Sequence, residues 1–291
     1  MSTQLGKIHY WYLGWLSNPD GTPNAMCQRI ANSPVSILIA YTHGWNDDPA
    51  RTGLCGSSVL YDANYAYAVL NLTPQVLALL HSKGIKVFGH KHGTDHGLED
   101  YATCIQVVKR ICETPGIDGY HDGEVNVLQS EYEDYAAAFT YFSNLYDLVK
   151  SYGKLVAYNT GAWMTGESIM HICDYVNFES NWWQGFTDLT PRYVQYMAWR
   201  TKYPAERFLG LTYTNDLTTA INDARTMWDT CHIGYPCSIP ALEELTLPTW
   251  YDAYIATLNP IPPTLPASFP IWMIPVTILG LGVIYLATKK K

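Results

Sequence analysis

Short apolar runs alternate with amphipathic stretches of 10 to 20 residues from about residue 7 to residue 259. The runs are rich in Val, Ile, Tyr and Phe, which favours strands, and the stretches between them have the spacing of helices. A regular alternation of this kind predicts parallel βα units. The predicted strands are 8–15, 36–45, 85–93, 117–123, 154–162, 174–182, 208–216 and 235–240.

The intervening stretches carry helix start and stop signals. Thr73 followed by Pro74 is a capping residue with proline at the first helical position. Glycine follows three of the helices directly before the next strand, at Gly84, Gly116 and Gly153. The predicted helices are 25–33, 73–83, 98–112, 131–152, 166–172, 189–203, 217–230 and 248–258.

Eight such units within 258 residues predict an α/β fold, a (β/α)8 TIM barrel over residues 1–258. The alternative is an open, doubly wound sheet. Its phosphate-binding GxGxxG turn is missing from the first βα connection, which reads GWLSNPDGTP. In a barrel, polar side chains at the carboxyl ends of the strands face the active site, so strand position gives a list of candidate residues.

The C-terminal tail has a different composition. Residues 259–270, NPIPPTLPASFP, predict an extended proline-rich linker. Residues 271–288 are uncharged and mostly apolar, which predicts a single transmembrane helix, and residues 289–291 are three lysines. The chain is therefore expected to contact a lipid bilayer through this helix.

The orientation of this anchor is open. The positive-inside rule keeps the terminal lysines cytoplasmic and places the barrel outside the cell. The N-terminal sequence MSTQLGKIHYWYLGW has no basic segment followed by an apolar one, so no signal peptide is visible. The alternatives are another export route, a tail anchor with a cytoplasmic barrel, or an enveloped particle.

Composition narrows the class of partner. The chain is 48% hydrophobic and 15% charged, which excludes general disorder. Its net charge of −8 argues against nucleic acid, because phosphate binding needs clustered Lys and Arg. The 23 Tyr and 10 Trp offer flat faces with polar edges that suit sugar rings as well as protein cores.

Seven cysteines contain no CxxC pair, so a zinc ribbon or a thioredoxin motif is not expected. Cys231 and Cys237 flank a Gly-Pro turn and are candidates for a disulfide bridge, as are Cys27 and Cys55. The odd number leaves at least one thiol free.

Carboxylates gather at two predicted strand ends. The segment IDGYHDGEVN contains Asp118, Asp122 and Glu124, and Glu179 lies in the apolar run VNFES. Two carboxylates across a cleft are what glycoside hydrolysis requires, one as proton donor and one as nucleophile or base. We predict that Glu179 acts with Asp122 or Glu124, and expect Asp118 to form a salt bridge or a loop cap.

Other strand-end residues are candidates for substrate binding. We expect the histidines to donate to sugar hydroxyls and the aromatic residues to stack on sugar rings. The predicted set is Trp11, His43, Trp45, His90, His92, Asn159, Trp163, Asn181, Trp182 and Tyr213.

The segment GHKHGTDH also suggests a metal site, because two histidines in an HxH pattern on one strand, here His90 and His92, can bind zinc. Metal-dependent barrel hydrolases add further His ligands on later strands, whereas the fifth and sixth strands here offer Asn and Glu. No metal and no other cofactor is predicted.

With these motifs in order, the chain resembles the spherulin-4-like family of (β/α)8 barrels, which is related to the polygalactosaminidase glycoside hydrolases. KVFGHKHGTDHGLEDYATCIQVV resembles the family's third strand and helix, and YDANYAYAVLNL resembles its second loop. DGYHDGE resembles the family's DGxFxDE strand, and YNTGAWMTGESIMHICDYVNFES resembles its fifth and sixth strands. The resemblance covers residues 8–216.

The resemblance implies hydrolysis of α-1,4-linked galactosamine or N-acetylgalactosamine polymers. The family's two glutamates fall on Glu124 and Glu179, while its aspartate falls on Gly123. Thr160 replaces the family's proline after Asn159, and His90 replaces a tyrosine.

We therefore predict a membrane-anchored glycoside hydrolase that acts on an amino-sugar polysaccharide. The alternative is a barrel that has lost catalysis and serves as a carbohydrate-binding or structural surface protein, which the Gly123 departure favours. A metal-dependent hydrolase is the third hypothesis.

Overall fold

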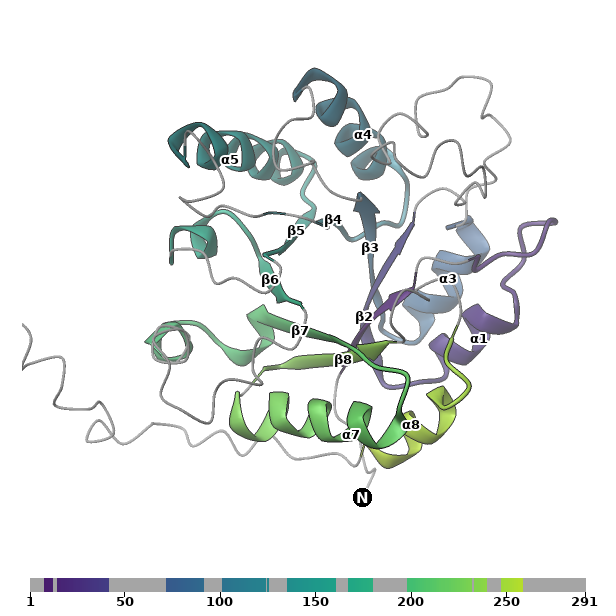
Figure 1. The fold of residues 1–291 in the computed structure, drawn as a ribbon. Coiled ribbons are helices and arrows are strands. Elements are labelled where there is room, and N and C mark those ends of the chain that lie inside the picture. Colours follow the sequence, from purple (N-terminus) through teal and green to yellow (C-terminus); the bar gives the residue numbers. More distant parts are fainter. Residues whose placement is uncertain are drawn as a thin grey trace, which may run out of the picture. The chain divides into compact units, whose positions relative to one another are not determined.

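The computed structural model describes residues 8–12, 15–41, 72–91, 101–123, 125, 135–160, 167–179, 198–231, 233–239 and 247–258. Within these ranges, eight parallel strands follow one another around a nearly closed barrel in the order of the sequence (Figure 1). The strands are β1 Ile8–Tyr12, β2 Val35–Tyr41, β3 Lys86–Lys91, β4 Gly119–Asp122, β5 Leu155–Asn159, β6 Tyr175–Phe178, β7 Phe208–Tyr213 and β8 Tyr235–Ile239.

The first and last strands, β1 and β8, contact each other where the barrel comes round on itself. His9 Nδ1 in β1 lies 2.7 Å from the backbone oxygen of Tyr235 in β8 and donates to it. All eight predicted strands are present, so the barrel predicted from the apolar pattern is confirmed.

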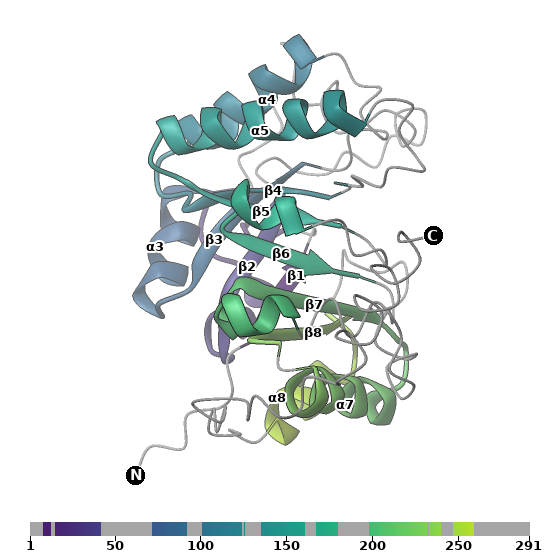
Figure 2. The same ribbon diagram turned by 90° about the vertical axis from the view of Figure 1, so that its left-hand side faces the viewer.

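Helices cover the outside of the barrel (Figure 2). Neighbouring helices pack in pairs, α1 with α3, α4 with α5, and α7 with α8. The α-helices are α1 Ala25–Ala31, α3 Pro74–Ser82, α4 Tyr101–Glu113, α5 Tyr135–Ser151, α7 Leu217–Arg225 and α8 Tyr251–Thr257. Shorter elements are the 3-10 helices η3 Glu167–His171 and η5 Ala205–Arg207, and the π-helix η6 Thr226–Thr230.

The predicted helix boundaries follow from local chemistry. Thr73 caps α3 by accepting a hydrogen bond from the backbone N–H of Val76, and Pro74 occupies the first turn. Gly84, Gly116 and Gly153 have φ values of 75°, 84° and 70°, which are left-handed values that favour glycine. Each of these glycines turns the chain from a helix into the next strand.

Side chains alternate between two environments along each strand. In β5, Tyr158 points outward and its hydroxyl donates to the backbone oxygen of Phe142 in α5, 2.8 Å away. Phe88 in β3 and Tyr175 in β6 face inward and meet edge to face across the barrel, with ring centroids 5.6 Å apart. Every interior position is therefore two residues from the next one on the same strand.

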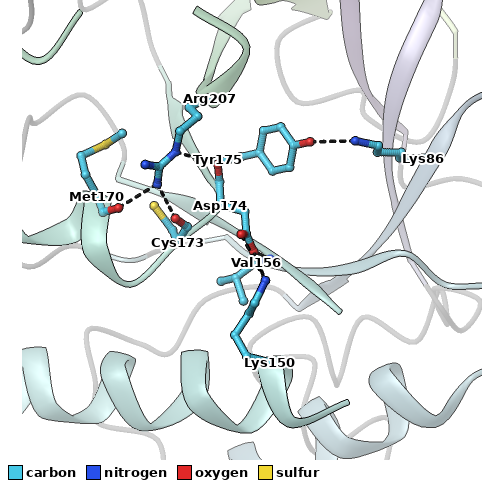
Figure 3. Close-up of polar contacts among 8 residues, drawn as sticks. All are labelled: Lys86, Lys150, Val156, Met170, Cys173, Asp174, Tyr175 and Arg207. Carbon is cyan, nitrogen blue, oxygen red and sulfur yellow. Dashed lines mark hydrogen bonds and ion pairs between the residues drawn. The ribbon is translucent and has the colours of Figure 1, made fainter. Parts of the chain in front are cut away.

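Two aspartates at the start of β4 and β6 are bonded in the same way, and we call the two sets of contacts the N-terminal rim. Asp174 precedes β6; its backbone N–H donates to Val156 of β5, and its carboxylate accepts from the N–H of Val156 at 2.8 Å. Lys150, in the last turn of α5, lies 3.0 Å from the same carboxylate (Figure 3). Arg207 donates to the carbonyls of Met170 and Cys173.

Asp118 repeats this arrangement before β4. Its N–H donates to Val87 of β3, and its carboxylate accepts from the N–H of Val87 at 2.7 Å. His81, in the last turn of α3, lies 3.0 Å from the carboxylate. The prediction that Asp118 forms a salt bridge or cap is confirmed, and its side chain faces the helix layer.

Two further predictions concern the cysteines and the membrane anchor. The predicted bridge between Cys231 and Cys237 is wrong, because both thiols are free and fully buried, and Cys27 is also free. Burial raises the pKa of these three thiols to about 12. No helix in the described ranges is long and apolar enough to span a membrane, and the predicted anchor at 271–288 lies outside them.

Candidate active site

Glu179 lies directly after β6, at the carboxyl end of the barrel, and is partly buried. Its side chain continues the inward-facing series of Tyr175 and Asn177. The side-chain amide of Asn159 donates to Oε2 of Glu179, and the hydroxyl of Tyr213 donates to Oε1. Strands β5, β6 and β7 thus each contribute one side chain to a single carboxylate site.

Asn159 connects this site to the end of β4. It is fully buried, and its amide group donates its second hydrogen to the backbone oxygen of Gly123, 2.8 Å away. Its own backbone oxygen accepts from the N–H of Val125 at 2.7 Å. The residues on both sides of Glu124 are therefore tied to Asn159, and Glu124 itself lies outside the described residues.

Neutral donors surround the Glu179 carboxylate. Both of its oxygens accept hydrogen bonds from uncharged side chains. In the described part of the chain, no Lys, Arg or His forms an ion pair with it. Among the described residues, two neutral donors therefore fix the orientation of this carboxylate.

A cluster of rings lies in the barrel interior. His90 of β3 and His121 of β4 are joined through their Nδ1 atoms, 2.7 Å apart. The Trp11 ring of β1 meets both imidazoles edge to face, with centroid distances of 5.0 Å and 4.9 Å. Trp11 is only 4% exposed and His90 1%. Trp11 and His90, both predicted to bind a sugar, are enclosed by the barrel.

Burial also keeps two of the histidines uncharged. Desolvation lowers the pKa of His9 from 6.5 to about 4, although the hydrogen bond to Tyr235 opposes part of this change. Desolvation, together with the charge of His9, lowers the pKa of His121 to about 3. Near neutral pH both imidazoles are neutral.

Asp122 does not face the barrel interior, so the prediction that it converges with Glu179 is wrong. It is fully buried and accepts a hydrogen bond from the Tyr120 hydroxyl at 2.5 Å. Its neighbour in β5 is Tyr158, which packs against Phe142 of α5. Asp122 therefore belongs to the helix-facing side of β4, the same side as Asp118.

The opposite face of β4 holds His121, which was not among the predicted site residues. His121 follows the alternation that puts Gly119 and Gly123 inside, and it pairs with His90 of β3. The signal was present in the sequence, because a salt-bridged Asp118 forces Asp122 outward and His121 inward.

Several predicted residues have no described position. Among the residues that can be placed, no three of His, Cys, Asp and Glu are close enough to hold a metal ion. Outside the described ranges lie His43, Trp45, His92, Glu124, Trp163, Asn181 and Trp182.

Comparisons with known proteins support the fold. No family model matches the chain, and no curated protein does. Among solved structures, the chain is similar to a GH18 chitinase from Pseudoalteromonas aurantia, with 12% identity, a TM-score of 0.52, and 87% of this chain and 99% of that chain covered.

Two further structures show the same likeness. A chitinase from Chromobacterium violaceum has 10% identity and a TM-score of 0.50, with 87% of this chain and 98% of that chain covered. A beta-glucuronidase from Bacteroides uniformis has 10% identity and a TM-score of 0.51, with 89% of this chain but only 35% of that chain covered. At these identities the likeness is one of fold, the (β/α)8 barrel.

Proposed function

We propose that the protein is a glycoside hydrolase in which Glu179 is the ionised carboxylate of the catalytic pair. The observation that carries the proposal is the position of Glu179 at the carboxyl end of the barrel, with Asn159 and Tyr213 donating to its two oxygens. The structures of similar fold include a chitinase and a beta-glucuronidase, which adds support.

The geometry suits the charge that develops in this reaction. Breaking a glycosidic bond builds positive charge at the anomeric carbon, and a nearby carboxylate stabilises that charge or attacks the carbon directly. Asn159 and Tyr213 hold the carboxylate in one orientation without removing its charge. A water molecule completes the hydrolysis by adding its oxygen to the sugar.

The reaction also needs a carboxylic acid that protonates the leaving oxygen. We propose Glu124 as the proton donor, because the family's first glutamate falls on it, while Asp122 faces the helices. Gly123 and Val125, on either side of Glu124, are both hydrogen-bonded to Asn159. As the acid, Glu124 gives its proton to the leaving sugar and recovers one from the attacking water.

The proposed substrate is an amino-sugar polysaccharide of the α-1,4-galactosamine or N-acetylgalactosamine type. Its support is the resemblance of DGYHDGE and YVNFES to the strands of the spherulin-4-like family. The structures of similar fold do not distinguish this sugar from others.

We also propose that residues 271–288 anchor the barrel to a membrane, with the barrel outside the cell or on an enveloped particle. The support is the uncharged apolar segment between the proline-rich linker and the three lysines. Fractionation should find the full chain in membranes after alkaline washing and a chain of residues 1–258 in the soluble fraction; a soluble full chain would contradict the anchor.

The decisive experiment compares Glu179→Gln with the unchanged protein. Galactosaminogalactan-type polymers and chitin are digested, and the released reducing ends are counted. We expect roughly a 10³-fold loss of turnover in Glu179→Gln, and a comparable loss in Glu124→Gln. Glu167→Gln is the matched control, because this carboxylate of η3 pairs with Lys202 at the surface. Equal turnover in Glu179→Gln and Glu167→Gln would exclude the proposed role of Glu179.

A carbohydrate-binding barrel without catalysis is the second candidate. The observation that favours it is the interior face of β4, where Gly123 stands at the family's aspartate position and Asp122 points away. If binding to the polymer is retained in Glu179→Gln and neither protein releases product, this second function replaces the first.

A further inference from the structure

Five polar atoms on the inner face of the barrel have no hydrogen-bond partner among the residues that the structure describes. Each belongs to a side chain that is between 0 and 4% exposed. The atoms are His9 Nε2, Trp11 Nε1, His121 Nε2, and Nδ2 and Oδ1 of Asn177.

Three of these side chains are close neighbours. His9 and Trp11 are two residues apart on β1 and therefore share its inner face. Trp11 contacts His121 across the barrel, and His9 is near enough to His121 to affect its charge. The neighbour of His121 in β5 is Ala157, whose methyl group fills little of the interior.

Asn177 contributes from the other side. It lies on β6 beside Asn159 of β5 and Leu209 of β7, two residues before Glu179 on the same inward face. Neither end of its amide group is bonded to a residue that the structure describes. It therefore presents one donor group and one acceptor directly below the candidate active site.

A ligand that satisfies all five atoms must both donate and accept hydrogen bonds. His9 Nδ1 donates to the Tyr235 carbonyl, so the neutral imidazole presents a lone pair at Nε2. The indole N–H of Trp11 can only donate, and Asn177 does both. Neutral water is a better match than an ion, because His9, Trp11 and Asn177 present uncharged donors and acceptors.

Energetics require that these atoms be satisfied. A buried polar atom without a partner destabilises a fold, and five of them rival the whole net stability of an ordinary domain. Internal water is the usual solution, because one molecule makes about three hydrogen bonds to such groups. The small side chain of Ala157 beside His121 adds little bulk to this polar interior.

We infer that the barrel interior below Glu179 is a binding site for a cluster of ordered water molecules held by His9, Trp11, His121 and Asn177. This hydrated chamber fixes the amide of Asn177 and so supports the strand end that carries Glu179. The inference does not depend on the proposed hydrolysis, because its tests measure water and stability.

The first test uses the indole N–H of Trp11 as a probe. Its NMR signal, assigned with Trp11→Phe, is expected to show a cross-peak to water of long residence time in the full chain. Absence of that cross-peak would overturn the inference.

The second test replaces Asn177 by leucine, which has a similar volume. A hydrated chamber loses hydrogen bonds in Asn177→Leu, so the unfolding equilibrium constant should rise about tenfold. A dry interior predicts the reverse, because the substitution removes unsatisfied atoms. Ser238→Ala is the control, since its buried hydroxyl already donates to the Ala220 carbonyl at 3.2 Å. A decrease of the unfolding constant in Asn177→Leu would contradict the chamber.

Discussion

Asp118 and Asp174 at the N-terminal rim each bind a strand N–H and a basic side chain, whereas Glu179 at the opposite end is held by two neutral donors. At the rim, the carboxylate contacts His81 or Lys150 and joins a helix end to two strands. At the carboxyl end, the described contacts of Glu179 are all with neutral donors. Within the described residues, the two ends of the barrel thus hold their carboxylates in different ways.

The barrel interior extends this contrast. His9, His121 and Asn177 are buried there away from the ion pairs of the rim, and burial keeps the two histidines neutral. Such groups cost stability unless they are satisfied. We therefore expect the N-terminal rim to stabilise the fold. We expect the barrel interior and the carboxyl end to serve the function.

The largest predicted effect is acid sensitivity that arises in the interior. The pKa values of His9, about 4, and His121, about 3, are below the 6.5 of an unfolded histidine. The unfolded chain therefore binds more protons than the folded one below pH 6.5, and stability falls as the pH falls. By pH 4 each histidine should have removed about 3 kcal/mol from the free energy of unfolding.

Denaturant unfolding at pH 7, 5.5 and 4 measures this loss. The His121→Gln variant should show a clearly shallower dependence, because glutamine does not titrate. The imidazoles facing one another here are His9, His90 and His121. Identical pH dependence in the variant and the unchanged protein would rule out the interior as the source.

The next effect tests the rim. Asp174→Ala removes the acceptor of the Val156 N–H and the partner of Lys150, so it should lower the free energy of unfolding by about 2 kcal/mol. Its turnover should stay unchanged. The control is Glu167→Ala, which breaks the exposed pair with Lys202 and should lower the free energy of unfolding by clearly less than Asp174→Ala does. Equal losses in the two variants would mean that the rim pair is no more than a surface ion pair.

The smallest effect concerns the carboxyl end. Tyr213→Phe removes one donor to Glu179, and a hydrogen bond to a charged group contributes roughly 1.5 kcal/mol. If that bond matters chiefly in the transition state, kcat falls about tenfold while the free energy of unfolding changes little. A large loss of stability with unchanged kcat would assign Tyr213 to the rim type of contact.

Much of the fold follows from local signals. The alternation of apolar runs and helical stretches predicted all eight strands, because periodicity is a property of neighbouring residues. The caps at Thr73 and the turns at Gly84 and Gly153 were predictable for the same reason.

The site was predictable only in part. Glu179, Asn159 and Tyr213 were each proposed as site residues from their positions at strand ends, and the structure brings the three together. Asp122 was placed on the wrong face of β4. Two expectations conflicted in the sequence itself, since Asp118 as a salt bridge and Asp122 as a cleft residue require opposite faces of one strand.

The amino-acid sequence by itself determined the order of strands and helices, the turns between them and the supply of polar residues at the strand ends. The tertiary structure decided which face of β4 points inward, that His121 meets His90, and that Glu179 is held by neutral donors. The reason is that a strand repeats every two residues, so both faces of β4 are allowed locally. Only its pairing with β3 and β5 selects one of them.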